Sequence, residues 1–156
     1  MAKNNNIRFL EKEKIPFQSI AYTYTEEDLS VKHIAQENNL AIEQIFKTLV
    51  NIANTGEVLI ALVSGLQEIH HKKLANLANV KKVEMAAMKD LQQLTGYIRG
   101  GCSPLGMKKP YRIFIDDSVL ALDTVFINAG QRGLLLGLTP STLISLTQGI
   151  LGDIHY

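Results

Sequence analysis

The stretch Phe46–Ser64, FKTLVNIANTGEVLIALVS, decides the fold. Two apolar, strand-like runs, 46–54 and 57–64, flank the tripeptide Asn54-Thr55-Gly56. Strand-like runs on either side of so short a glycine-containing segment are typical of a β-hairpin. The sequence therefore predicts an antiparallel pair of strands at the centre of the chain.

A lysine lies inside the first of these strands. Period-two alternation places Lys47, Leu49 and Asn51 on one face of the strand and Phe46, Thr48 and Val50 on the other. A lysine in such a position either protects an exposed strand edge or points into a pocket. The pattern alone favours neither.

The flanking segments predict an α+β fold. Helices are expected over 5–14, over 30–37 with Ser30 as N-cap, over 71–77 and 86–94 with Gly96 as a stop, and after Thr139-Pro140, ending by Gly149. Further strands are expected at 17–24, 112–115, 124–128 and 134–138. So many short strands favour a closed or half-closed, barrel-like, largely antiparallel sheet with helices packed outside, in one domain spanning 1–156.

Length and composition are those of an ordinary globular domain. The chain has 156 residues, of which 46% are hydrophobic and 20% charged. No apolar run approaches the ~20 residues of a membrane-spanning helix, the N-terminus has no apolar signal core, and the single Cys102 suits a reducing compartment. These features predict a cytoplasmic protein without membrane association.

The net charge of +1 neither requires nor excludes nucleic-acid binding. Local basic groups could supply phosphate contacts or could simply be solvated: Lys72-Lys73, Lys81-Lys82, Lys108-Lys109 and Arg112.

The residue patterns that common metal-binding, nucleotide-binding and hydrolase motifs require are absent from the sequence. His70 and His71 are adjacent and so point in different directions, and one cysteine cannot build a zinc site. No phosphate-binding P-loop, dinucleotide fingerprint or serine-hydrolase elbow is present. The sequence therefore predicts neither a metal nor another cofactor.

The most informative segment is the first glycine loop, Arg99–Lys109, RGGCSPLGMKK. Its glycines and proline permit sharp turns that aim backbone N–H groups at an anion, although a plain tight turn has the same composition. A second glycine loop, Asn128–Gly133, is expected to be a hairpin turn. Cys102 is expected to be a loop or buried residue rather than a nucleophile, and Asp116-Asp117 to start a turn rather than to supply a base.

Four motifs, in this order and spacing, resemble those of the YbaK family, the free-standing Cys-tRNA(Pro) deacylases related to the editing domain of bacterial prolyl-tRNA synthetases. They are Phe46-Lys47-Thr48-Leu49, Lys81-Lys82-Val83-Glu84-Met85-Ala86, Thr95-Gly96-Tyr97 and Gly100-Gly101-x-Ser103-Pro104-Leu105-Gly106. An early Ile15-x-Phe17…Tyr22 and a late Arg132-Gly133-Leu134 also fit, so the resemblance spans nearly the whole chain.

The resemblance implies a trans-editing enzyme that removes cysteine from mischarged tRNA(Pro), with Cys-tRNA(Cys) as a further candidate. It implies no metal, aminoacylated tRNA as substrate and prolyl-tRNA synthetase as a candidate partner. Lys47 would hold the terminal adenosine and its phosphate, Tyr22 would line the site, and the substrate's own thiol would attack the ester. Expected substrate-binding residues are Thr48, Gly100, Gly101, Ser103, Pro104, Gly106, Gly130, Arg132 and Gly133.

Two positions depart from the family pattern. Leu135 follows Leu134 where some members carry an acidic residue, and Ala129-Gly130 replaces a Gly-Gly pair. These departures leave two alternatives open. One is an editing enzyme of another specificity, such as Ala-tRNA(Pro), and the other is a non-catalytic module that binds tRNA or a synthetase.

Overall fold

The predicted hairpin is the centre of a five-stranded sheet. In the computed structural model, which describes residues 4–156, strand β2 (Phe46–Ala53) pairs antiparallel with β3 (Val58–Ser64), and Lys47 lies opposite Val63. The sheet order is β4-β2-β3-β5-β8, where β4 is Val83–Met85, β5 is Arg112–Asp116 and β8 is Ile150–Gly152. The β3–β5 and β5–β8 pairs are parallel, a detail that the sequence did not predict.

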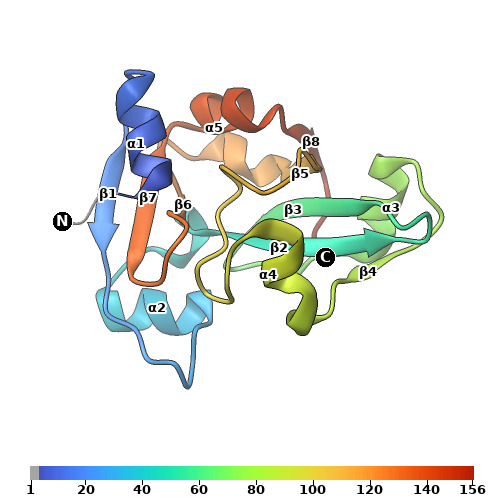
Figure 1. Ribbon diagram of the computed structural model, residues 1–156, viewed down its shortest axis with the longest axis horizontal. Coiled ribbons are helices and arrows are strands. Elements are labelled where there is room, and N and C mark those ends of the chain that lie inside the picture. Colours follow the sequence, from blue (N-terminus) through green and yellow to red (C-terminus); the bar gives the residue numbers. More distant parts are fainter. Residues whose placement is uncertain (1–3) are drawn as a thin grey trace.

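A second sheet has three antiparallel strands in the order β1-β7-β6. Its strands are β1 (Gln18–Ala21), β6 (Val125–Asn128) and β7 (Leu134–Leu138). A bridge between Ile45 and Phe126 connects it to the start of β2 (Figure 1). The expected α+β fold, with a half-closed and largely antiparallel arrangement of strands, is confirmed, although β1 is shorter than the expected strand over 17–24.

Five α-helices surround the two sheets in the described part of the chain: α1 (Asn5–Lys12), α2 (Val31–Asn38), α3 (His71–Ala78), α4 (Leu91–Thr95) and α5 (Pro140–Thr147). Short 3₁₀ turns lie at η1 (Ile42–Gln44), η2 (Met88–Asp90) and η3 (Asp117–Ala121). The side chains of Ser30 and Thr139 cap α2 and α5, as predicted. Gly96 ends α4 in the left-handed conformation, also as predicted.

The helix expected over 86–94 is wrong in its first half. Ala86 N donates to Val50 O at 2.9 Å and so continues the pairing of β4 with β2, and Ala87 is extended. Pairing with a neighbouring strand has overridden the local helix propensity there.

The two faces of each sheet pack against different partners. The main core lies between the sheets and beneath α1 and α5, with Phe46, Ile60 and Leu136 among its members. Helix α3 covers the other face of the five-stranded sheet, and α2 covers the outer face of the three-stranded sheet (Figure 1). Among residues 4–156, no helix is both long and apolar enough to cross a membrane.

Candidate active-site pocket

A small pocket lies where α2, the three-stranded sheet and the start of β2 meet. Its volume is about 160 Å³, and we call it the Lys47 pocket. Its walls are mostly apolar, with polar groups at a few points. The lining residues are Tyr22, Leu29, Val31, Ile34, Ile45, Phe46, Lys47, Thr48, Gly100, Cys102, Asn128 and Leu135.

Strand β2 contributes the cation of this pocket. The pairing of β2 with β4 and Ala86 reaches back only to Val50, so Lys47 and Thr48 lie on a stretch that β4 does not cover. The Lys47 side chain is 22% exposed, and its Nζ lies 3.7 Å from Oε1 of Glu68, which is 83% exposed. An ion pair with so exposed a carboxylate is weak, so Glu68 leaves the Lys47 ammonium available for another contact.

Thr48 carries the one orphaned polar atom found in the described residues. Its Oγ1 is buried and has no hydrogen-bond partner. Leaving such a group unpaired costs about 1–3 kcal/mol, so this hydroxyl keeps an unused hydrogen-bonding capacity. Because Thr48 lines the pocket, this unpaired hydroxyl belongs to the pocket wall.

Tyr22 follows β1 and lies on the side of the three-stranded sheet that α2 covers. It is 7% exposed, and burial raises the pKa of its phenol above the ordinary value. The hydroxyl is therefore neutral at physiological pH and available as a hydrogen-bond donor.

Asn128, at the end of β6, joins the two glycine loops. Its Nδ2 donates to the Gly100 carbonyl at 2.7 Å and lies 3.5 Å from the Tyr22 hydroxyl, while its Oδ1 accepts from the N–H groups of Gly130 (2.7 Å) and Gln131 (3.1 Å). Asparagine before a glycine turn commonly accepts such backbone bonds, and that signal could have found this residue in the sequence.

Close contact between the two loops explains the glycine at position 101. A Cβ on Gly101 would lie 3.2 Å from Gln131 Cα, so the two backbones approach as closely as glycine permits. Arg132 Nε donates to Arg99 O at 2.9 Å, and Gly133 O accepts from Tyr22 N at 2.9 Å. Gly101, Arg132 and Gly133 thus fix the loops from outside the pocket lining.

The far side of the first loop rests on a buried polar network. Ser103 is fully buried, its Oγ lies 2.5 Å from Asn6 Oδ1, and it accepts from Leu105 N at 3.0 Å. Asn6 Nδ2 donates to the Tyr97 hydroxyl at 3.0 Å, and this hydroxyl donates to the Leu105 carbonyl. The network holds the loop against α1, and no sequence signal pointed to Asn6.

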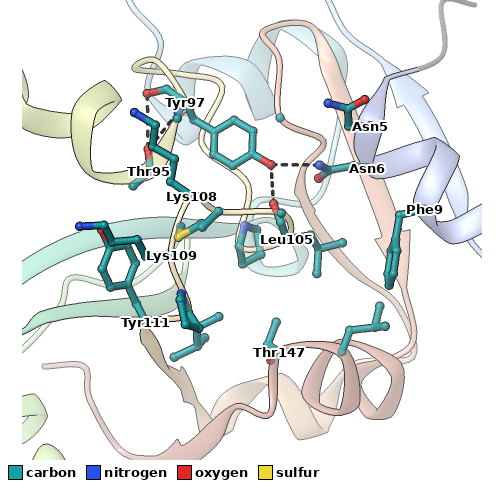
Figure 2. Close-up of a pocket in the computed structure, with 18 of the residues that line it drawn as sticks. Asn5, Asn6, Phe9, Thr95, Tyr97, Leu105, Lys108, Lys109, Tyr111 and Thr147 are labelled. Atoms are coloured by element: carbon teal, nitrogen blue, oxygen red, sulfur yellow. Dashed lines mark hydrogen bonds between the residues drawn. The ribbon is translucent and has the colours of Figure 1, made fainter.

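A second and much larger cavity opens on that far side (Figure 2). This α1–α5 groove, of about 950 Å³, is bounded by α1, residues 95–97, residues 104–113 and the end of α5. Pro104, Gly106 and Gly130 line it, whereas Tyr22, Lys47, Thr48 and Gly100 line the Lys47 pocket. The structure therefore divides the expected site residues among the pocket, the groove and the supports of the two loops.

Cys102 lines the Lys47 pocket, but it is a poor nucleophile. Burial raises the pKa of its thiol to about 11, so the thiolate is scarce at neutral pH. The expectation that Cys102 is not a nucleophile agrees with this environment.

Asp116 begins η3 by accepting from Ser118 N, which confirms the expected turn. It also accepts from Ile154 N, and its Oδ1 lies 2.7 Å from His155 Nδ1. Asp116, Asp153 and His155 form one group of metal-compatible geometry within residues 4–156, a cluster that the sequence analysis missed. None of the three lines the Lys47 pocket, and Asp153 pairs with Lys73 Nζ at 2.9 Å.

The basic groups fall into different environments. Lys73 pairs with Asp153, and Arg112 forms two 2.8 Å bonds to Glu57. Lys81 and Lys82 are exposed beside Asn54, far along the hairpin from the loops. Lys108-Lys109 is the lysine pair that lines a cavity.

Comparison with known proteins places this fold in a family. Residues 25–146 match the aminoacyl-tRNA editing domain family. The chain is 38% identical over 152 residues to "Putative Cys-tRNA(Pro)/Cys-tRNA(Cys) deacylase EbsC" of Enterococcus faecalis, covering 97% of this chain and 93% of that protein. It is 24% identical over 131 residues to a proline–tRNA ligase of Brachyspira hyodysenteriae, covering 78% of this chain but only 23% of the ligase.

A solved structure described as "a putative trans-editing enzyme for prolyl tRNA synthetase" superposes with a TM-score of 0.81 at 23% identity, covering 99% of both chains. Fold and sequence thus define an editing-domain protein. The chain belongs to the aminoacyl-tRNA editing domain family.

Proposed function

We propose that this protein is a free-standing deacylase that removes cysteine from mischarged tRNA(Pro), with Cys-tRNA(Cys) as a second substrate. The observation that carries the proposal is the Lys47 pocket, where a lysine, a neutral tyrosine hydroxyl, an unpaired threonine hydroxyl and a glycine-loop wall meet in one small cavity. The similarity to EbsC supports the choice of cysteine.

The size of the pocket supports a small aminoacyl side chain. An apolar protein cavity of ~150 Å³ holds one benzene molecule, so about 160 Å³ suits the side chain of cysteine but not a nucleoside. Leu29, Cys102 and Leu135 give its walls an apolar character, and Leu135 is 3% exposed. An aliphatic group at position 135 suits an uncharged side chain such as a thiol.

Lys47 is proposed to hold the substrate's terminal phosphate. An ammonium is a compact hydrogen-bond donor for phosphate. When the phosphate takes the place of the Glu68 carboxylate beside Lys47, a charge-assisted contact replaces a weak surface ion pair. In this arrangement the nucleotide stays at the mouth of the pocket, the aminoacyl group enters, and the Tyr22 and Thr48 hydroxyls serve as hydrogen-bond donors to the ester.

The chemistry is proposed to come from the substrate. Among the described residues that line the pocket there is no histidine, no carboxylate and no thiol of lowered pKa. The cysteinyl thiol, with an ordinary pKa of ~8.5, is itself a strong nucleophile once ionised. Its sulfur forms the bond to the ester carbonyl carbon, the C–O bond to the ribose breaks, and the thiol proton passes to the departing ribose oxygen, giving a thiolactone and free tRNA. Positioning accelerates such an intramolecular attack.

The deciding experiment is deacylation of purified Cys-tRNA(Pro), followed by product analysis. We expect cysteine release well above the buffer rate, and no release from tRNA(Pro) carrying S-methylcysteine, because its sulfur cannot attack and lose a proton. A wild-type protein that works only at the buffer rate would refute the deacylase. Rapid release of S-methylcysteine would refute the thiol mechanism alone.

The lysine is tested by Lys47→Ala and Lys47→Met, the second of which keeps an apolar stem of similar length. Both should remain folded and lose roughly 10- to 100-fold in kcat/KM, the worth of a charge-assisted hydrogen bond. Lys89→Ala, at an exposed lysine that lines neither cavity, is the matched control.

A second candidate is an editing enzyme for Ala-tRNA(Pro), favoured by the apolar wall at Leu135. Alanine has no side-chain nucleophile, so this reaction would need a water molecule in the pocket. A panel of mischarged tRNAs separates the two specificities, and binding of tRNA without turnover would instead support a non-catalytic module. We further propose that the protein acts in the cytoplasm beside prolyl-tRNA synthetase, since that enzyme produces the mischarged substrate.

A further inference from the structure

The α1–α5 groove takes no part in the chemistry proposed above, yet its volume of about 950 Å³ is several times that of the Lys47 pocket. Its charges all have one sign. Lys108, Lys109 and Arg112 line it, and no aspartate or glutamate does. Lys108 and Lys109 are exposed, and within residues 4–156 neither forms an ion pair, whereas Arg112 is held by Glu57.

Aromatic side chains lie among these cations. Phe9 of α1 is 44% exposed and lies across the opening from Lys109 and Tyr111 in Figure 2. The hydroxyls of Tyr97 and Tyr111 donate to the carbonyls of Leu105 and Leu94, which fixes both rings in the wall. Lysines beside aromatic rings are the combination that single-stranded nucleic acids require, because phosphates meet the cations and bases stack on the rings.

The groove adjoins the Lys47 pocket through the two glycine loops. Cys102 lines the pocket and Pro104 lines the groove. These two residues are two positions apart in the chain, so their Cα atoms are separated by about 7 Å or less. On the second loop, Asn128 lines the pocket and its neighbour Ala129 lines the groove. Only the two glycine loops therefore separate the Lys47 pocket from the groove.

A pocket of about 160 Å³ leaves almost the whole of a tRNA substrate outside. We propose that the α1–α5 groove binds the single-stranded 3′ segment of that tRNA, with Lys108 and Lys109 on its phosphates and Phe9 stacked on a base. This assignment rests on the proposed deacylase function. It gives the chain an RNA-binding surface despite a net charge of only +1.

The direct test is binding of a fluorescein-labelled, single-stranded oligoribonucleotide with the sequence of the tRNA(Pro) 3′ end, measured by anisotropy over a range of salt concentrations. The double variant Lys108→Gln/Lys109→Gln should raise Kd by about tenfold or more and reduce the salt slope by about 1.4, because each single-strand phosphate contact contributes ~0.7. Phe9→Leu, which removes the ring but keeps an apolar side chain, should raise Kd by about fivefold or more.

The matched control is Lys81→Gln/Lys82→Gln, which removes the same charge from an exposed pair outside both cavities. It should bind the oligoribonucleotide as wild type does. Equal binding by the two double variants, or no binding by wild type, would overturn the groove assignment. Displacement of the RNA by polyglutamate of equal charge at equal concentration would also overturn it, in favour of an acidic peptide.

Kinetics separate this proposal from the function on which it rests. With mischarged tRNA, Lys108→Gln/Lys109→Gln should raise KM by about the same factor as Kd. With cysteinyl-adenosine, which reaches only the Lys47 pocket, its kcat/KM should match wild type. RNA binding in the groove without any deacylation would refute the proposed deacylase function but not the groove assignment. Deacylation of tRNA at the same rate by wild type and groove variants would refute the groove assignment but not the deacylase function.

Discussion

Replacing Asn128 by alanine should weaken the protein and the reaction together, because one side chain joins both glycine loops. Asn128→Ala removes three hydrogen bonds of 2.7–3.1 Å, to Gly100, Gly130 and Gln131. At about 1 kcal/mol net for each, the free energy of unfolding should fall by about 3 kcal/mol. In a domain of this size that corresponds to a fall in Tm of roughly 6–12 °C.

The effect on activity follows from the position of the loops. Gly100 lines the Lys47 pocket, so release of its carbonyl should shift the pocket wall, and a displacement near 1 Å costs up to about 100-fold in rate. We expect at least a tenfold loss of kcat/KM for Cys-tRNA(Pro), measured below the unfolding transition.

Asn54→Ala is the control for this experiment. Asn54 Oδ1 accepts two backbone bonds, from Lys81 N and Lys82 N, in a turn that lines neither cavity. The control should lose about 2 kcal/mol of stability and keep its activity within about twofold. The reasoning fails if Asn128→Ala loses less than about 0.5 kcal/mol in urea unfolding, or if both variants lose activity equally.

Three further predictions concern the surroundings of the pocket and the far end of the sheet. Glu68→Gln should lower KM for Cys-tRNA(Pro) by up to about fivefold, because it removes the counterion that competes for Lys47; a raised KM would contradict this. Cys102→Ala should keep kcat within about threefold, since burial holds the pKa of this thiol at about 11, and a loss beyond 100-fold would instead make it a nucleophile. At Asp116, burial opposes the charge, but hydrogen bonds from His155, Ser118 and Ile154 outweigh burial and lower the carboxyl pKa. A lowered folded-state pKa means that this carboxylate stabilises the fold above the ordinary carboxyl pKa and that the stabilisation is lost as pH falls below about 4. The free energy of unfolding of Asp116→Asn should therefore depend less on pH in that range than that of the wild type. An unchanged pH dependence would show that other carboxylates are responsible for it.

The sequence determined those features that depend on neighbours along the chain. Two apolar runs on either side of Asn54-Thr55-Gly56 predicted the central hairpin, and the side-chain caps at Ser30 and Thr139 predicted two helix starts. These are local patterns, in which a period or a cap involves residues at most a few positions apart. The same local logic failed at 86–87, where a bond to Val50 rather than the local sequence sets the conformation.

Only the tertiary structure decided how the expected site residues are divided. Lys47 and Gly100 share a pocket because β2, α2 and both glycine loops converge there, while Ser103, from the same loop, turns inward to Asn6. The Ser103–Asn6 contact spans 97 positions of sequence, and the Asn128–Gly100 contact spans 28. No periodicity encodes contacts at such separations, because they depend on how whole elements pack. The sequence therefore specified most of the elements and the family motifs, and packing alone set which side of the loops each residue faces.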